Sequence, residues 1–182
     1  MRKFILIALG AIVVLIGGFA LIVALKSPEF RMTRSVTMAA PPVAVFAQVN
    51  DFHKWEAWSP WAKLDPAAKN TFEGPAAGTG AIFRWAGNDQ VGEGSMTITE
   101  SRPNELVRMQ LDFLKPMAAT NSAEFTFVPT GNGTTVTWSM YGTNSFICRA
   151  VCMFMDMDKM VGGQFEQGLA SMKAIVEAAP KN

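Results

Sequence analysis

The sequence has few of the residues that bind metals or form disulfides. Its 182 residues include two cysteines, one histidine and one tyrosine. A tetrahedral zinc site needs four convergent nitrogen or sulfur ligands, and Cys148 and Cys152 lie far from His53 in sequence. The two cysteines are four residues apart in a segment predicted to be helical, where the backbone resists closing a disulfide. We therefore expect no metal, no cofactor and no structural disulfide.

Strong charge of either sign is also lacking. Sixteen Lys and Arg oppose fifteen Asp and Glu, which leaves a net charge of +1 and no field to gather polyphosphates. Thirteen Phe and five Trp, against a single Tyr, favour buried surface over stacking on exposed bases. Nucleic acid is therefore not expected as a partner. With 49% hydrophobic residues, the sequence is typical of a domain that encloses something apolar.

A long uncharged run opens the chain. No charged residue occurs over positions 4–25, and at about 1.5 Å per residue such a helix crosses a hydrocarbon core about 30 Å thick. The alternative is a cleaved signal peptide that uses Arg2 and Lys3 as its basic start. The run is longer than the apolar part of a usual signal peptide, and no Ala-x-Ala-like site follows it. The sequence therefore predicts an uncleaved transmembrane anchor over residues 1–26.

The charges around this helix do not decide its orientation. Arg2 and Lys3 precede it, whereas Lys26, Arg31 and Arg34 follow it, so the positive-inside count is divided. We assign the N-terminus to the inside of a single-pass membrane protein, with the bacterial inner membrane as its expected location.

Residues 27–182 are predicted to form one globular domain. The segment 30–38 alternates apolar and polar side chains, as a half-buried strand does. Proline at positions 41 and 42 marks the start of a short amphipathic helix through Val49, and a second short helix is predicted over residues 51–58.

Beyond Pro66 the pattern is that of an antiparallel meander. Gly, Pro, Asn and Asp cluster about every ten residues between short alternating runs. The turn at 129–133 joins the last two runs as a hairpin. The strands predicted from these runs cover residues 81–85, 95–99, 106–113, 123–127 and 136–140.

After Asn144 the period changes from 2 to 3.6, which predicts a long amphipathic helix. Gly162 and Gly163 lower its helix propensity, so we expect a kink or break there, and Pro180 ends the helix. Its apolar positions are Phe154, Met157, Val161, Phe165, Leu169, Met172 and Val176. A curved antiparallel sheet with one apolar face needs such a cover, so the predicted fold class is α+β.

Several stretches resemble the START and birch-pollen-allergen-like superfamily, called SRPBCC, and in particular its polyketide cyclase-like bacterial branch. The resemblance extends over about residues 30–177, and Trp55 to Trp61 is its most specific part. It implies a helix-grip fold, in which the sheet wraps around the long C-terminal helix and leaves a hydrophobic ligand tunnel. The matching stretches are Ala40 to Phe46, Asn50 to Phe52, Trp55 to Trp61, Gly92 to Ile98 and Asp156 to Met160.

The expected pocket lies between the sheet and the long helix. Trp55, Trp58 and Trp61 are interpreted either as a plug at the end of the core, or as a pocket mouth or membrane-interface belt. We assign no catalytic residue, because His53 has no recognisable nucleophile motif to serve. The residues predicted to bind a ligand are Trp55, Trp58, Phe83, Trp85, Met96, Met109, Leu111, Phe125, Phe127, Trp138, Met140, Met157 and Phe165.

Three functions are consistent with these patterns. The leading one is a membrane-anchored binding module for a hydrophobic small molecule, lipid-like or polycyclic, taken from the bilayer close by. The alternative is an enzyme of the cyclase, dehydratase or hydrolase type that acts on a hydrophobic substrate in the same pocket. The third is a domain with a solid core that docks partners.

Overall fold

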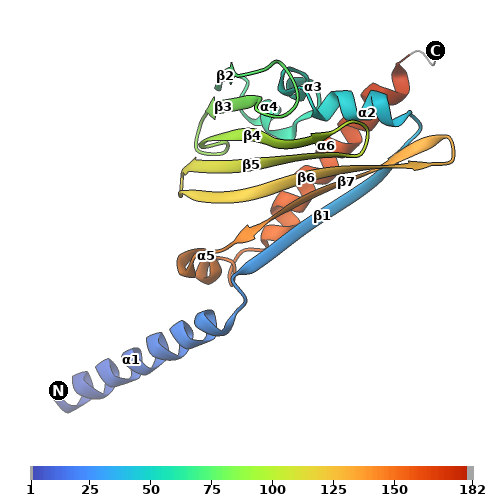
Figure 1. Ribbon diagram of the computed structural model, residues 1–182. Coiled ribbons are helices and arrows are strands. Elements are labelled where there is room, and N and C mark those ends of the chain that lie inside the picture. The colour runs from blue at the N-terminus through green and yellow to red at the C-terminus, as the bar shows by residue number, and fades with distance from the viewer. Residues whose placement is uncertain (1, 180–182) are drawn as a thin grey trace. The chain divides into compact units, whose positions relative to one another are not determined.

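Seven antiparallel strands form one sheet in the order β1-β7-β6-β5-β4-β3-β2 (Figure 1). In this computed structural model, which describes residues 2–179, neighbouring strands from β2 to β7 also follow one another in the chain. The strands are β1 (Glu29–Met38), β2 (Lys69–Glu73), β3 (Ile82–Ala86), β4 (Glu93–Arg102), β5 (Leu106–Lys115), β6 (Ala119–Thr130) and β7 (Gly133–Thr143).

Figure 1 shows the long helix α6 running along one face of this sheet, which confirms the predicted α+β fold with a helix-covered antiparallel sheet. Proline occupies the first helical position of both α2 and α4, where its missing N–H leaves no bond unmade. The helices are α1 (Arg2–Leu25), α2 (Pro42–Val49), the 3₁₀ turn η1 (Phe52–Lys54), α3 (Trp55–Trp58), α4 (Pro60–Leu64), α5 (Phe146–Val151) and α6 (Met157–Ala178).

The strand register places the predicted apolar residues on one face. Val107 lies opposite Phe125, which lies opposite Trp138 on the next strand. The residues next to them in sequence point to the other face of the sheet. There Ser139, which follows Trp138, forms a hydrogen bond with the hydroxyl group of Thr33 on β1. Alternation with period 2 therefore identified the core side of each predicted strand.

Two details of the secondary structure differ from the sequence prediction. The C-terminal helical segment breaks at residues 152–156, between α5 and α6, while α6 continues through Gly162 and Gly163. Phe154 is therefore not part of the long helix. The structure also adds β2 and α4, which the patterns did not indicate, and Pro180 lies outside the described residues.

The chain divides into two compact units. One contains the chain through Phe30 together with Thr143–Asp156, and the other contains Arg31–Gly142 with the rest of the chain from Met157. In the first unit, α1 is long and apolar enough to cross a membrane. Its residues are exposed except near the C-terminal end, where Val23 is buried. The second unit holds the sheet face, α6 and the candidate site.

Candidate functional site

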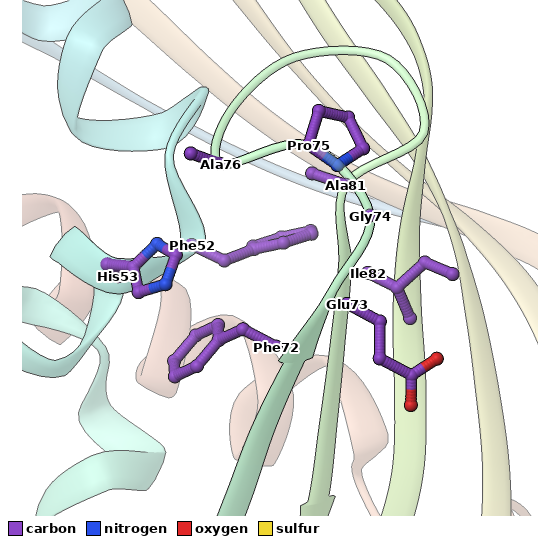
Figure 2. Close-up of a pocket in the computed structure, with 9 residues that line it drawn as sticks. All are labelled: Phe52, His53, Phe72, Glu73, Gly74, Pro75, Ala76, Ala81 and Ile82. Carbon is purple, nitrogen blue, oxygen red and sulfur yellow. The ribbon is translucent and has the colours of Figure 1, made fainter.

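A half-open cavity of about 210 Å³ lies in the second unit beside β2 and β3 (Figure 2). Its floor is apolar: Phe52 and Ala81 are buried, and Phe72 is 43% exposed. His53 follows Phe52 in η1, and the other lining residues come from the ends of β2 and β3 and from the loop between them. The lining residues are Phe52, His53, Phe72, Glu73, Gly74, Pro75, Ala76, Ala81 and Ile82.

The loop over residues 74–80 forms one wall of the cavity, and two backbone hydrogen bonds hold its C-terminal end. The amide of Gly78 donates to the carbonyl of Asn50 at 2.9 Å, and the amide of Gly80 donates to the carbonyl of Ile98 at 2.8 Å. Gly74 has a φ of 77°, where a side chain would also overlap the carbonyl of Gly80. The wall therefore exists before any ligand arrives.

Two titratable side chains line the cavity, and both are already engaged. The Nδ1 atom of His53 lies 2.9 Å from a carboxylate oxygen of Asp51, and the His53 ring stacks on Phe72 at a centroid distance of 4.1 Å. Glu73 accepts a hydrogen bond from Nε of Arg84 at 2.9 Å, and this contact raises the pKa of Arg84. His53 and Glu73 are both exposed, so the cavity combines an apolar floor with a polar rim.

Aromatic rings connect the cavity floor to the interior. Phe52 contacts Trp55 at 5.4 Å and Phe83 at 6.0 Å between ring centroids. Trp55 in turn contacts Trp58 at 4.6 Å and Phe125 at 5.8 Å. The cavity is therefore the outer end of a continuous aromatic core.

Trp138 is the centre of that core. Its ring stacks on Phe165 of α6 with centroids 4.1 Å apart and planes at 7°, and on Phe125 at 4.7 Å. Rings at these separations leave no space for a third group between them. On α6, a side-chain carbon at Gly168 would lie 3.0 Å from the Trp138 ring, so a residue without a side chain suits this position. At this level the sheet and α6 are in direct contact.

The indole N–H of Trp138 is buried and has no acceptor among the residues that the structure describes. The other buried tryptophans differ in this respect. Nε1 of Trp55 donates to the carbonyl of Val49 at 3.0 Å, and Nε1 of Trp58 donates to that of Gln48 at 3.2 Å. Trp138 therefore presents an unused hydrogen-bond donor inside an apolar core. Leaving a buried donor without a partner lowers the free energy of unfolding by about 1–3 kcal/mol.

The structure places the thirteen predicted ligand-binding residues around this core, and none of them lines the cavity. Two of them contact its lining residues: the ring of Phe83 lies 5.4 Å from that of Phe72, and the ring of Trp55 lies 5.4 Å from that of Phe52. Of the three tryptophans interpreted as a plug or a pocket mouth, Trp55 and Trp58 are buried and Trp61 is half-buried. Phe83, Trp85 and Met157 are half-buried; the buried members of the set are Trp55, Trp58, Met96, Met109, Leu111, Phe125, Phe127, Trp138, Met140 and Phe165.

An ion-pair clamp holds α6 to the first strand of the same unit. Nε of Arg34 lies 2.6 Å from Glu166, and its Nη2 lies 2.9 Å from Asp158. Asp158, Gly162 and Glu166 are spaced by four residues and so share one face of the helix. Hydrogen bonds from Arg34 hold the pKa of Asp158 below its usual value. This contribution to stability is therefore present at neutral pH and is lost as the pH falls through the lowered pKa.

Gly162 makes room for the clamp. A side-chain carbon at this position would overlap the guanidinium of Arg34, whereas one at Gly163 would meet nothing within 4 Å. A side-chain carbon at Gly162 would displace the Arg34 guanidinium from Asp158 and Glu166, so we predict that Gly162→Ala stabilises the chain by about 0.5–1 kcal/mol less than Gly163→Ala does. Gly163→Ala is the matched control and is expected to raise the free energy of unfolding by up to about 1 kcal/mol. Denaturant unfolding of the two variants measures both, and equal effects would contradict the packing role of Gly162.

Sequence patterns had not identified Arg34 or the cavity, and of the lining residues only His53 had been considered, as a catalytic candidate. The sequence did contain an indication of Arg34: it lies on the same face of the predicted strand as Met32, Val36 and Met38, where an apolar residue is expected. The cavity gave no comparable signal, since it depends on how residues 72–82 fold back against η1.

A family model described as "Polyketide cyclase / dehydrase and lipid transport" matches residues 29–177. A search of curated proteins finds no match.

Solved structures share the fold at low sequence identity. A protein from Thermobifida fusca has a TM-score of 0.61 at 21% identity, covering 84% of this chain and 97% of its own. Ara h 8.0201 has a TM-score of 0.57 at 13% identity, covering 83% and 99%. The di-domain ARO/CYC protein BexL of the BE-7585A biosynthetic pathway has a TM-score of 0.60 at 15% identity, with 87% of this chain and 53% of BexL covered. These similarities show the helix-grip fold.

Proposed function

Because the chain belongs to the polyketide cyclase / dehydrase and lipid transport family, we propose that it is a membrane-anchored module that binds a hydrophobic small molecule. The family is of the SRPBCC type, whose members bind hydrophobic ligands or act as polyketide cyclases. The ligand that fits this chain is lipid-like or polycyclic, with few polar atoms.

The observation that carries the proposal is the half-open cavity with the buried ring of Phe52 in its floor. The rings of Phe52 and Phe72 give the cavity an apolar surface, which is what binding pockets offer to apolar ligands. From Phe52 the aromatic core leads to Trp138, whose unused N–H suits the single polar atom of a mainly apolar ligand. The thirteen residues predicted from sequence lie behind this floor, and they would contact only a ligand that enters between the sheet and α6.

Packing at the end of α1 supports a retained anchor over a cleaved signal peptide. Arg149 donates through Nη1 to the carbonyls of Lys26 at 2.8 Å and Ala24 at 3.3 Å, and Val23 is buried. A signal peptide leaves the mature protein, so it has no reason to pack against residues 143–156. Only residues 26–28 separate α1 from β1, which keeps the domain close to the bilayer that supplies an apolar ligand.

A cavity-filling substitution tests the site. Ala76 lines the cavity and is exposed, while its neighbour Ala77 does not line it. In nanodiscs that contain a photoactivatable fatty acid, we expect labelling of the peptide spanning residues 72–83 in the native chain. Ala76→Trp should reduce that labelling about tenfold or more, because each 1.4 kcal/mol of lost binding is a factor of ten. Ala77→Trp should leave it unchanged, and equal labelling of both variants would count against the cavity.

An enzyme is the second candidate because of the contact between His53 and Asp51. With Nδ1 held by the carboxylate at 2.9 Å, Nε2 is left as the free ring nitrogen at the cavity rim. Molecules co-purified with the native chain and with His53→Gln distinguish the two functions. A binding module carries the same molecule in both, whereas an enzyme accumulates unconverted substrate in the variant.

A further inference from the structure

Residues 146–155 expose an unusually apolar surface in the unit that contains α1. Ile147 is 65% exposed and Phe154 is 80% exposed. A surface of this kind on a folded segment marks a contact with a partner or a membrane. The other large apolar side chains exposed along it are Phe146, Val151, Met153 and Met155.

The single charged residue in this segment is Arg149, and its guanidinium turns toward α1. It donates to the carbonyls of Ala24 and Lys26 and lies 5.8 Å from the ring of Phe146. Ala24 is in the last turn of α1 and Lys26 directly follows the helix, so their carbonyls have no donor within the helix. Arg149 therefore both satisfies the end of α1 and leaves the outward face of residues 146–155 without charge.

Contact with α1 fixes the depth of this surface. The ring of Phe154 stacks on Phe19 with centroids 5.9 Å apart. Phe19 precedes the end of α1 at Leu25 by six residues, which corresponds to about 9 Å along the helix axis. If α1 spans a bilayer and ends at its interface, Phe154 lies at the depth reached by interfacial helices, about 5–10 Å below the headgroups.

We infer that residues 146–155 are a second membrane-contacting element, which inserts its apolar side chains into the lipid interface beside α1. The inference rests on the proposed membrane anchoring of α1. Continuity of the two apolar surfaces through Phe19 and Phe154 favours lipid as the occupant over a partner protein. With both α1 and residues 146–155 in the membrane, the segment that follows α1 would move less than with α1 alone.

The two native cysteines provide the test. Cys152 is exposed, and Cys148→Ala leaves it as the sole thiol of the full chain. We would attach an environment-sensitive fluorophore there and place one copy per phosphatidylcholine nanodisc, with some lipids carrying a nitroxide near the headgroup. The inference predicts a shift of the emission to shorter wavelength and loss of most of it to the nitroxide.

Two reference sites complete the experiment. With both cysteines replaced by alanine, Asn132→Cys reports on an exposed turn of the other unit, and Val14→Cys reports on the middle of α1. The Asn132 site should show neither the shift nor the quenching, and the Val14 site should show the blue shift.

The outcomes separate the inference from the anchor. A buried Val14 site with a Cys152 site that behaves like Asn132 overturns the inference and leaves the anchor standing. If the Val14 site is also in water, the anchor itself fails and the inference fails with it. A second preparation with two copies per nanodisc tests for contact between chains. If Cys152 is shielded there and not with one copy, the lipid contact is overturned in favour of a second copy of the chain.

Discussion

Truncation of Trp138 to alanine is expected to lower the free energy of unfolding by about 3–5 kcal/mol, as loss of a buried tryptophan does. Its ring stacks on both Phe125 and Phe165 and so joins the sheet to α6. Chemical unfolding of the purified chain measures the change. A loss below about 1 kcal/mol would mean that the aromatic core is not the main contact between these layers.

Replacement by phenylalanine separates the role of the Trp138 ring from that of its N–H. Trp138→Phe keeps an aromatic ring and removes a donor that has no acceptor in the described chain, so we expect a change within about 1 kcal/mol. Trp55→Phe is the matched control, because it breaks a hydrogen bond to Val49 and leaves a buried carbonyl unpaired. Trp55→Phe should therefore lower the free energy of unfolding by about 1–2 kcal/mol more than Trp138→Phe does. Similar losses in both variants would show that the Trp138 N–H is bonded in solution.

Charge in the middle of α1 is expected to abolish membrane retention. Val14→Arg with Leu15→Arg places two guanidinium groups at the centre of the apolar run, at about 2.5–3.5 kcal/mol each on the insertion scale. The native chain should resist alkaline carbonate extraction, and the double variant should be released. Val14→Leu with Leu15→Val is the control and should behave as the native chain. Release of the native chain, or an N-terminus that begins after residue 26, would contradict the anchor.

The sequence predicted those parts of the fold whose pattern is local. Phe125 and Trp138 were placed on one face of a hairpin by alternation alone, and the turn at 129–133 by its glycines and asparagine. By contrast, β2 is exposed along its whole length, so burial imposes no alternation on it. Likewise, Gly162 contacts Arg34, which is distant in sequence, so no local pattern could indicate why a glycine lies within the helix.

The candidate site was less predictable than the fold. Inward-facing residues such as Met109 and Phe165 could be identified from periodicity, but whether they enclose space or fill it depends on contacts between elements. The cavity instead lies where Phe52 meets the loop after Phe72, which no local pattern indicates. Whether the thirteen predicted residues contact a ligand remains a prediction.

The most direct test of the central claim is native mass spectrometry of the full chain released from nanodiscs. We predict a species heavier than the 182-residue chain by one small apolar molecule, retained by Ala77→Trp and lost from Ala76→Trp. A native chain without any bound molecule, or an Ala76→Trp variant that carries it equally, would contradict the account of this protein as a hydrophobic-ligand binder.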